Sequence, residues 1–391
     1  MIVNELRVED ICDFVGGSQP EKSEFIYEAK PGYIRLIQTR DYKTDAFLTY
    51  IPENSTRKFC DEHDVMIGRY GPPIFQICRG LKGAYNVALM KAKPKKGIDR
   101  EFLYYFLKQD SVLQYVEKLS PRTGGQTGVD LVSLNKYPVR IPKDIEDQRR
   151  LVASLVAIDK KIELNNRINA ELEAMAKTLY DYWFVQFEFP DDNGKPYKTS
   201  GGKMVYNSTL KREIPEGWCD ASLVDIATFT NGIACQKYYP TGDEPTYKVI
   251  KIREFSSGFD DSSESVHQGV PEKVVVYDGD ILFSWSATLE VQLWTGGTGA
   301  LNQHIFKVTS DSYPKTFYYF EVLKYLEYFK MVAELRKTTM GHITKDHLVA
   351  SRVSLPPKEL IQAMDAKLSP ILSKIISNNQ QNSELSKLRD R

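Results

Sequence analysis

The sequence predicts an α+β protein in which two repeated mixed α/β domains are separated by a long antiparallel two-helix coiled coil. Three observations predict this fold: an internal duplication, a long helical stretch without glycine in each repeat, free of proline in the first and holding only Pro370 in the second, and asparagines at matching places in both stretches. The chain has 391 residues, which is long for one ordinary core. Its apolar content of 42% is that of a folded globular protein.

The duplication appears as five segments that recur in the same order, at offsets between 213 and 216 residues. The pairs are VEDICDFVGG (8–17) with LVDIATFTNG (223–232), IRLIQTRDY (34–42) with YKVIKIREF (247–255), HDVMIG (63–68) with GDILFS (279–284), KGAYNVALMK (82–91) with TGALNQHIFK (298–307), and KIELNNRIN (161–169) with KIISNNQQN (374–382).

Each repeat begins with short β-branched and aromatic runs broken by Gly, Pro, Asn and Asp, which is typical of a mixed α/β domain. A long helical pattern follows, after Pro142 in the first repeat and after the Pro356 region in the second. We therefore expect a first domain at 1–143, a first spacer helix at 144–187, a connector at 188–213, a second domain at 214–357 and a second spacer helix at 358–391.

Both predicted helices carry a heptad seam. In the first it runs through Leu151, Leu155, Ile158, Ile162, Asn165, Asn169, Leu172, Ala176, Leu179 and Trp183, and in the second through Met364, Leu368, Ile371, Ile375, Asn378, Asn382 and Leu385. An amide in an apolar seam lowers stability unless it meets another polar group, so it selects the register in which amides meet. Asn166 and Asn379 lie outside the seam and are interpreted as solvated.

If the two helices pack on each other, Asn165 should lie near Asn382 and Asn169 near Asn378, which requires antiparallel helices. The connectivity favours the same direction, because the end of the first helix then lies beside the start of the second. About 40 residues at 1.5 Å each make a rod of roughly 60 Å. We expect a heptad inserted between Leu172 and Leu179 to lengthen this spacer.

The usual enzyme signatures are missing from the sequence. TGGQTG (123–128) and TGGTG (295–299) lack the lysine and helix start of a phosphate-binding loop, and neither Pro-Pro pair has the flanking residues of an amino-methyltransferase motif. The five histidines show no metal-ligand spacing, and PDD (190–192) lacks a following nuclease Glu and Lys. A catalytic site without a recognisable motif stays open as an alternative; the main interpretation is a binding protein.

The five cysteines include no CxxC pair, the N-terminus has no signal-peptide core, and no apolar run reaches about 18 residues. We therefore expect reduced thiols, no membrane segment and a cytoplasmic protein. Two similar domains held apart by a stiff spacer suit a duplex polymer with half-sites about 34 Å apart per helical turn.

Loop-like positions in both repeats carry side chains that can read base edges or contact phosphate. In the first domain the candidates are Gln38, Arg40, Lys43, Arg69, Tyr70, Lys82, Arg122, Thr123 and Gln126; in the second they are Lys251, Arg253, Trp285, Ser286, Lys337, Thr338 and His342. Segment 79–100 holds seven basic residues and one acidic residue, which makes it the best phosphate-facing candidate. The net charge of zero predicts weak, salt-sensitive binding by the chain alone.

The sequence resembles the specificity subunits of type I restriction-modification systems over nearly its whole length. The likeness is strongest in WFVQFEFPDDNGKPYKTSGGKMVYNSTLKREIPEGW (183–218), which is similar to the family's junction between first helix and second domain. GDILFSWSATLE (279–290) and GALNQHIFKV (299–308) resemble motifs of the second target-recognition domain, and IGRYG (67–71) and KGAYNVALMK (82–91) resemble an alternative set in the first.

The resemblance implies a non-catalytic subunit that recognises a bipartite site in double-stranded DNA, with one target-recognition domain for each half-site. It implies docking of two modification (methyltransferase) subunits on the helices, with S-adenosylmethionine bound by those partners and no cofactor in this chain. Restriction and translocase subunits would join for cleavage. The chain departs from the pattern in two places: its N-terminus lacks the IPEGW of the second repeat, and 358–391 has no counterpart of LYDYWF (179–184), so we expect the far end of the coil to be less covered.

Two rival interpretations remain at this point. A fused modification enzyme or nuclease would need this chain to bind the cofactor. A scaffold that uses only the coiled coil would leave the duplication of whole domains unexplained.

Overall fold

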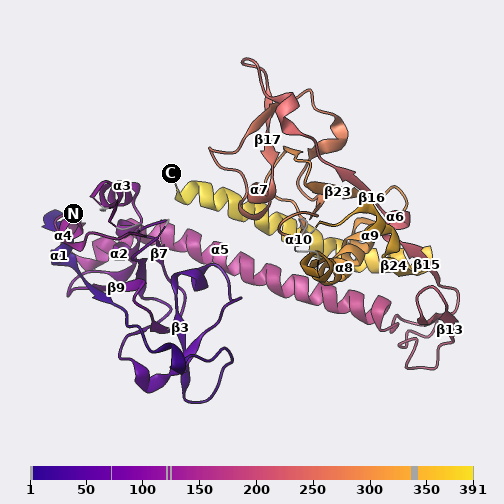
Figure 1. The fold of residues 1–391 in the computed structure, drawn as a ribbon, viewed down its shortest axis with the longest axis horizontal. Coiled ribbons are helices and arrows are strands. Elements are labelled where there is room, and N and C mark those ends of the chain that lie inside the picture. The colour runs from indigo at the N-terminus through magenta and orange to yellow at the C-terminus, as the bar shows by residue number, and fades with distance from the viewer. Residues whose placement is uncertain (1–2, 72, 120–121, 124–125, 336–341, 391) are drawn as a thin grey trace. The chain divides into compact units, whose positions relative to one another are not determined.

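The computed structural model describes residues 3–71, 73–119, 122–123, 126–335 and 342–390, and it confirms the α+β class (Figure 1). The chain divides into two compact units, 1–159 and 160–391. Each unit contains one repeat of the mixed α/β domain.

The first unit contains twelve of the described strands and four short helices, followed by the start of a long helix. The strands are β1 (Val3–Arg7), β2 (Cys12–Gly16), β3 (Tyr33–Ile37), β4 (Tyr50–Pro52), β5 (Phe59–Cys60), β6 (Val65–Gly68), β7 (Ile77–Cys78), β8 (Gly83–Tyr85), β9 (Leu89–Pro94), β10 (Arg122–Thr123), β11 (Gln126–Thr127) and β12 (Pro138–Pro142). The helices are α1 (Val8–Ile11), α2 (Arg100–Leu107), α3 (Asp110–Leu119), α4 (Leu131–Asn135) and α5 (Ile145–Tyr180).

After a β-hairpin, the second unit repeats most of this order of elements. Its strands are β13 (Met204–Asn207), β14 (Arg212–Pro215), β15 (Cys219–Ser222), β16 (Thr228–Asn231), β17 (Thr246–Ile250), β18 (Ser265–His267), β19 (Val275–Val276), β20 (Ile281–Ser284), β21 (Glu290–Leu293), β22 (Gly299–Leu301), β23 (Ile305–Thr309) and β24 (Arg352–Leu355). Its helices are α6 (Leu223–Ile226), α7 (Ile252–Ser257), α8 (Lys315–Leu335), α9 (Lys345–Ala350) and α10 (Lys358–Arg389).

The two repeats have the same sheet topology. Sheet β2-β9-β6-β7 of the first unit corresponds to β16-β23-β20-β21 of the second, and β4-β3-β8-β5 corresponds to β18-β17-β22-β19. The parallel pairing of two strands also recurs, with Leu36 opposite Ala84 in the first unit and Val249 opposite Ala300 in the second. The duplication read from the sequence is therefore a duplication of fold.

The apolar runs that mark the repeats form the central strands. All four residues of β6 are buried, and so are all four of β20, as expected for strands covered on both faces. In the first unit, α2 and α3 are separate helices, with Phe102 and Leu103 buried in the core. In the second unit a single helix, α8, takes their place and carries the aromatic side chains of a larger core.

Helix α5 contributes side chains to the hydrophobic cores of both units. Near its start Val152 belongs to the core of the first unit, whereas near its end Tyr180 is fully enclosed by the core of the second. The Tyr180 hydroxyl donates to Glu321 Oε1 of α8 at 2.8 Å, and its ring stacks on Phe320 with 4.9 Å between centroids. A π-helical turn, η4 (Asp181–Val185), continues α5 and buries Trp183.

Within the second unit the later part of α5 packs antiparallel to α10 (Figure 1). Asn165 Nδ2 donates to Asn382 Oδ1 at 2.8 Å and to Gln381 Oε1 at 2.9 Å. Four residues further along α5, Asn169 Oδ1 accepts from Asn378 Nδ2 at 2.8 Å. The residue numbers rise on one helix as they fall on the other, so the predicted antiparallel arrangement is confirmed.

The amides outside the seam take part in the same network, which corrects their interpretation as merely solvated. Asn169 Nδ2 donates to Asn379 Oδ1 at 2.7 Å, and Asn382 Nδ2 donates to Asn166 Oδ1 at 2.8 Å. The reason is that each seam amide has both a donor and an acceptor to satisfy, and the facing seam amide supplies only one partner. The flanking amides supply the other.

Two further details differ from the heptad pattern. Leu151 is 52% exposed, so the seam does not begin there; Val152 faces the core instead. Pro370 lies inside α10 without ending the helix. Both Pro370 and Ala366, whose carbonyl loses its helical partner, are exposed, so water can replace that hydrogen bond.

We predict that Asn169→Leu lowers the free energy of unfolding by about 1–3 kcal/mol, because it leaves the buried Asn378 amide without its acceptor. The double variant Asn169→Leu/Asn378→Leu should recover most of this loss, since both buried polar groups are then removed. Urea unfolding of the full chain measures both effects.

The matched control for this experiment is Asn166→Ala, which removes an exposed amide of the same network and should change stability by no more than about 0.5 kcal/mol. Equal losses for the single leucine variant and the double variant would show that the amide pairing contributes nothing.

Candidate nucleic-acid interface

The structure brings Arg69 and Tyr70, which follow β6, next to the end of the Gly-rich turn. Tyr70 forms an antiparallel bridge with Gly128, and the Val129 amide donates to Arg69 O at 3.1 Å. The Arg69 guanidinium lies over the Tyr70 ring, 5.3 Å from its centroid. Two candidate residues of the first domain therefore lie beside Gly128 and Val129.

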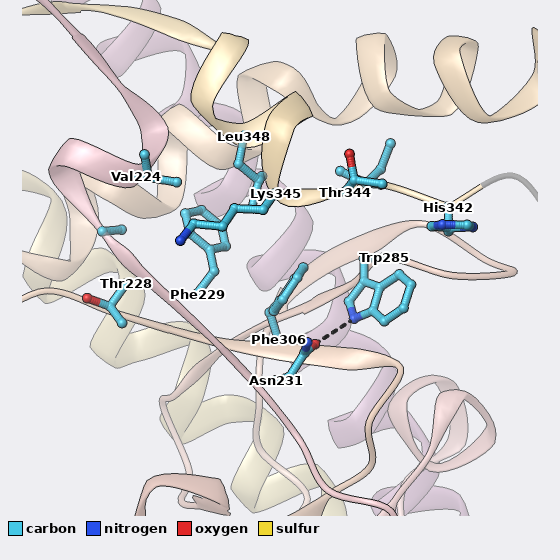
Figure 2. Close-up of a pocket in the computed structure, with 12 residues that line it drawn as sticks. Val224, Thr228, Phe229, Asn231, Trp285, Phe306, His342, Thr344, Lys345 and Leu348 are labelled. Carbon is cyan, nitrogen blue, oxygen red and sulfur yellow. Dashed lines mark hydrogen bonds between the residues drawn. The ribbon is translucent and has the colours of Figure 1, made fainter.

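The same arrangement recurs after β20 in the second domain. The Ile343 amide donates to Trp285 O at 3.0 Å, which places His342 beside Trp285, with 5.8 Å between ring centroids. The indole Nε1 of Trp285 donates to Asn231 Oδ1 at 3.0 Å (Figure 2). Trp285 is half-buried, while Asn231 and His342 are exposed.

A pocket of about 470 Å³ opens beside Trp285 (Figure 2). Its wall is largely apolar, with Phe229, Phe306 and Leu348, and its rim carries the polar side chains of Asn231 and Lys345. The sequence pattern did not single out Asn231 or the two phenylalanines. The signal was present in TFTNG (228–232), which repeats DFVGG (13–17) but replaces its first glycine by Asn231.

Gln38 and Arg40 lie at a second pocket, of about 400 Å³, in the first domain. Arg40 is half-exposed, packs over the Phe47 ring at 5.0 Å and approaches Asp41 only to 3.9 Å. Lys43 is exposed nearby. Gln19, Lys22 and Asn86 also line this pocket, and sequence reasoning missed them because they come from two segments distant in sequence from Gln38 and Arg40.

The counterparts Lys251 and Arg253 are engaged in ion pairs within the second domain. Lys251 pairs with Glu264, and the hydrogen bonds from Lys251 and Tyr239 hold the pKa of Glu264 below its usual value. Arg253 pairs with Glu254 at 2.5 Å and with Asp260 at 3.3 Å. These two cations are therefore largely neutralised, in contrast to Arg40.

The basic segment 79–100, which the sequence gives as the best phosphate-facing candidate, is only partly available to phosphate. Arg79 pairs with Glu101 at 2.6 Å and with Asp159 at 3.1 Å, and its guanidinium lies 3.8 Å from the Tyr104 centroid. Lys91, Lys95 and Arg100 pair with Asp64, Asp13 and Asp61. These charges form ion pairs within the first domain, whereas Lys82, Lys93 and Lys96 are exposed.

The structure describes only some of the remaining candidate DNA-binding residues. Arg122, Thr123 and Gln126 lie in the two-stranded hairpin β10–β11, where Thr123 is opposite Gln126. Ser286 is half-buried directly after Trp285. Lys337 and Thr338 lie outside the described residues.

Two features bear on possible chemistry. Burial raises the pKa of Cys12 to about 12 and that of Cys60 and Cys78 to about 11, so these thiols are protonated and poor nucleophiles. Within the described ranges there is no group of three or more His, Cys, Asp or Glu side chains that could hold a metal ion, and no helix is long and apolar enough to cross a membrane.

The comparisons with known proteins agree with this architecture. A family model described as the type I restriction modification DNA specificity domain matches residues 3–174 and 215–387. The specificity subunit of the type I restriction enzyme MjaIX from Methanocaldococcus jannaschii is 25% identical over 405 residues, covering 98% of this chain and 90% of the relative. The HindI specificity subunit from Haemophilus influenzae is 22% identical over 346 residues, covering 74% of this chain and 75% of the relative.

A solved structure shares the fold. The crystal structure of the type I restriction-modification S subunit from M. genitalium superposes with a TM-score of 0.55 at 12% identity, covering 100% of this chain and 94% of that one.

Duplicated α+β domains with paired helices define a class of two-domain recognition proteins. The chain belongs to the type I restriction-modification DNA specificity family, whose members are non-catalytic subunits.

We predict that Arg79→Ala destabilises the first domain by about 2 kcal/mol, because it leaves Glu101 and Asp159 without their shared cation. Lys82→Ala should leave stability unchanged within about 0.5 kcal/mol but reduce the salt dependence of DNA binding by about one phosphate contact. Thermal unfolding and a salt titration of binding measure the two effects. The opposite pattern would show that Arg79 faces the phosphates.

Proposed function

We propose that the chain reads a bipartite site in double-stranded DNA, with the domain at 1–143 reading one half-site and the domain at 214–357 reading the other. The observation that carries this proposal is the repeated backbone arrangement at Arg69 and Trp285, which presents different side chains from the same position of one fold. Two copies of one reader with different reading residues suit two half-sites of different sequence.

The spacer helices at 144–187 and 358–391 would set the gap between the half-sites. Helix α5 is one continuous helix of 36 residues, about 54 Å long, and a hydrophobic core packs against each of its ends.

The exposed surface of the paired helices is the proposed docking place for two modification subunits. We propose that those partners bind S-adenosylmethionine and methylate the DNA, that restriction and translocase subunits join them for cleavage, and that the complex works in the cytoplasm.

The charge of the chain fits a subunit that needs partners for affinity. Its formal net charge is zero, and several cations of both domains are paired with carboxylates. Non-specific attraction to DNA depends on unpaired cations that release counterions, so the isolated chain should bind weakly.

The direct test uses the full chain assembled with modification subunits, a random duplex library and mapping of the methylated adenines. We expect one consensus with two specified parts separated by an unspecified gap of fixed length. A consensus in one continuous block, or methylation without sequence preference, would contradict the proposed function.

The structure indicates a different position for the heptad insertion that tests the spacer role of α5. Leu172 and Leu179 pack against the core of the second unit, so an insertion between them would disrupt that core. An insertion between Lys160 and Lys161 falls after the contacts of Asp159 and before the amide network at Asn165.

We predict that seven residues inserted there widen the unspecified gap by about 10 Å, or about three base pairs, and leave both half-sites unchanged. Methylation mapping of the inserted variant measures the gap. A changed half-site, or an unchanged gap, would contradict the role of α5 as the spacer.

A further inference from the structure

The loop after β6 and the loop after β20 share a backbone frame that fixes one residue in each domain. The amide of Arg69 donates to Ala88 O at 2.8 Å and its carbonyl accepts from Val129; the amide of Trp285 donates to His304 O at 3.4 Å and its carbonyl accepts from Ile343. Each of these residues is therefore held on both sides by neighbouring segments.

The backbone has a positive φ two residues further along in both loops. Gly71 has φ 108°, and its counterpart Ala287 has φ 59°, a conformation that alanine rarely adopts. A non-glycine residue keeps such a backbone only where the surroundings impose it, and these residues gather at functional sites. Both loops therefore have a positive φ at this position, although one residue is glycine and the other alanine.

The two domains carry different side chains at corresponding positions of this backbone frame. Arg69 is replaced by Trp285, and Gly16, whose added Cβ would lie 3.9 Å from Arg69 Nη1, is replaced by Asn231. A guanidinium offers a planar fork of donors that matches the two acceptors of guanine in the major groove. Arg69 is half-buried and its stacking on Tyr70 limits where the fork can point.

Trp285 presents a different chemistry. Its indole N–H can only donate, so the Asn231 oxygen must face it, which fixes the orientation of the amide. The ring lies between His342 and Phe306, each 5.8 Å away, and borders the apolar pocket (Figure 2). An apolar edge of this kind favours the 5-methyl group of thymine over the polar edges of guanine or cytosine.

We propose that residues 69 and 285 are the equivalent specificity-determining positions of the two domains, with Arg69 reading a guanine in one half-site and Trp285 reading the methyl edge of a thymine in the other. Asn231 is a positioning residue, because it acts by holding the indole. This inference rests on the proposed function and adds the base chemistry of each half-site.

The experiment maps adenine methylation by the full complex carrying Arg69→Ala or Trp285→Ala. Arg69→Ala should relax one G:C position in one half-site only, and Trp285→Ala should relax one A:T position in the other half-site only. Arg69→Lys keeps the charge but loses the fork, so it should relax the same position as Arg69→Ala. Asn231→Ala should weaken the preference at the Trp285 position without changing the preferred base.

Base analogues test the chemistry on the unaltered protein. Replacing the assigned guanine by 7-deazaguanine removes one acceptor and should weaken binding at least about five-fold. Replacing the assigned thymine by deoxyuridine removes one methyl group and should weaken binding about four-fold. The same replacements at other positions of the half-sites should have smaller effects.

Matched controls are Arg140→Ala and Tyr206→Ala, exposed residues of strands β12 and β13 whose loss should leave the consensus unchanged. Thermal unfolding shows whether each variant is folded. If Trp285→Ala does not fold, Trp285→Phe replaces it, because phenylalanine keeps an aromatic ring at this position. A consensus unchanged by Arg69→Ala and Trp285→Ala, or a uniform loss at every sequence, would overturn this inference. A wild-type complex without a bipartite consensus would instead overturn the proposed function.

Discussion

The buried amide network between α5 and α10 constrains the rest of the second unit, because each amide is satisfied only when the helices run in opposite directions in one register. Asn165 and Asn169 are 1% and 6% exposed, so water cannot replace the partners that α10 supplies. The aromatic core at Tyr180 fixes the end of α5 independently. The amides extend that fixed register along the helix toward the first domain.

Duplication gives the chain two copies of one fold, one for each half-site of the proposed function. The sheets, the parallel strand pair and the hydrogen bonds around residues 69 and 285 are the same in both domains, because backbone groups make them and many side chains are compatible with them. The side chains on that frame differ completely: guanidinium and glycine in one domain, indole and amide in the other. A stable frame with exchangeable side chains would suit the two half-sites of the proposed function.

The sequence predicted the features that have a period or a repeat, and missed those that depend on distant partners. Heptad spacing was sufficient for both helices and for the pairing of Asn165 with Asn382, although Pro370 shows that one exposed proline does not end a helix. Arg79 and Lys251 were read as possible DNA contacts because their partners Asp159 and Glu264 lie 80 and 13 residues away in the sequence. Asn231 went unnoticed because only the fold brings it to Trp285, 54 residues away.

The most direct test of the account is the distance between spin labels on α5 and α10, measured by pulsed electron paramagnetic resonance in the full chain with Cys219 replaced by serine. Labels at Glu163 and Glu384, both exposed and flanking the Asn165–Asn382 pair, should give one short, narrow distance. Labels at Glu163 and Lys367 should be farther apart by roughly 25 Å of helix length. A broad distribution for the first pair, or a shorter distance for the second, would contradict the antiparallel amide-paired helices on which the spacing depends.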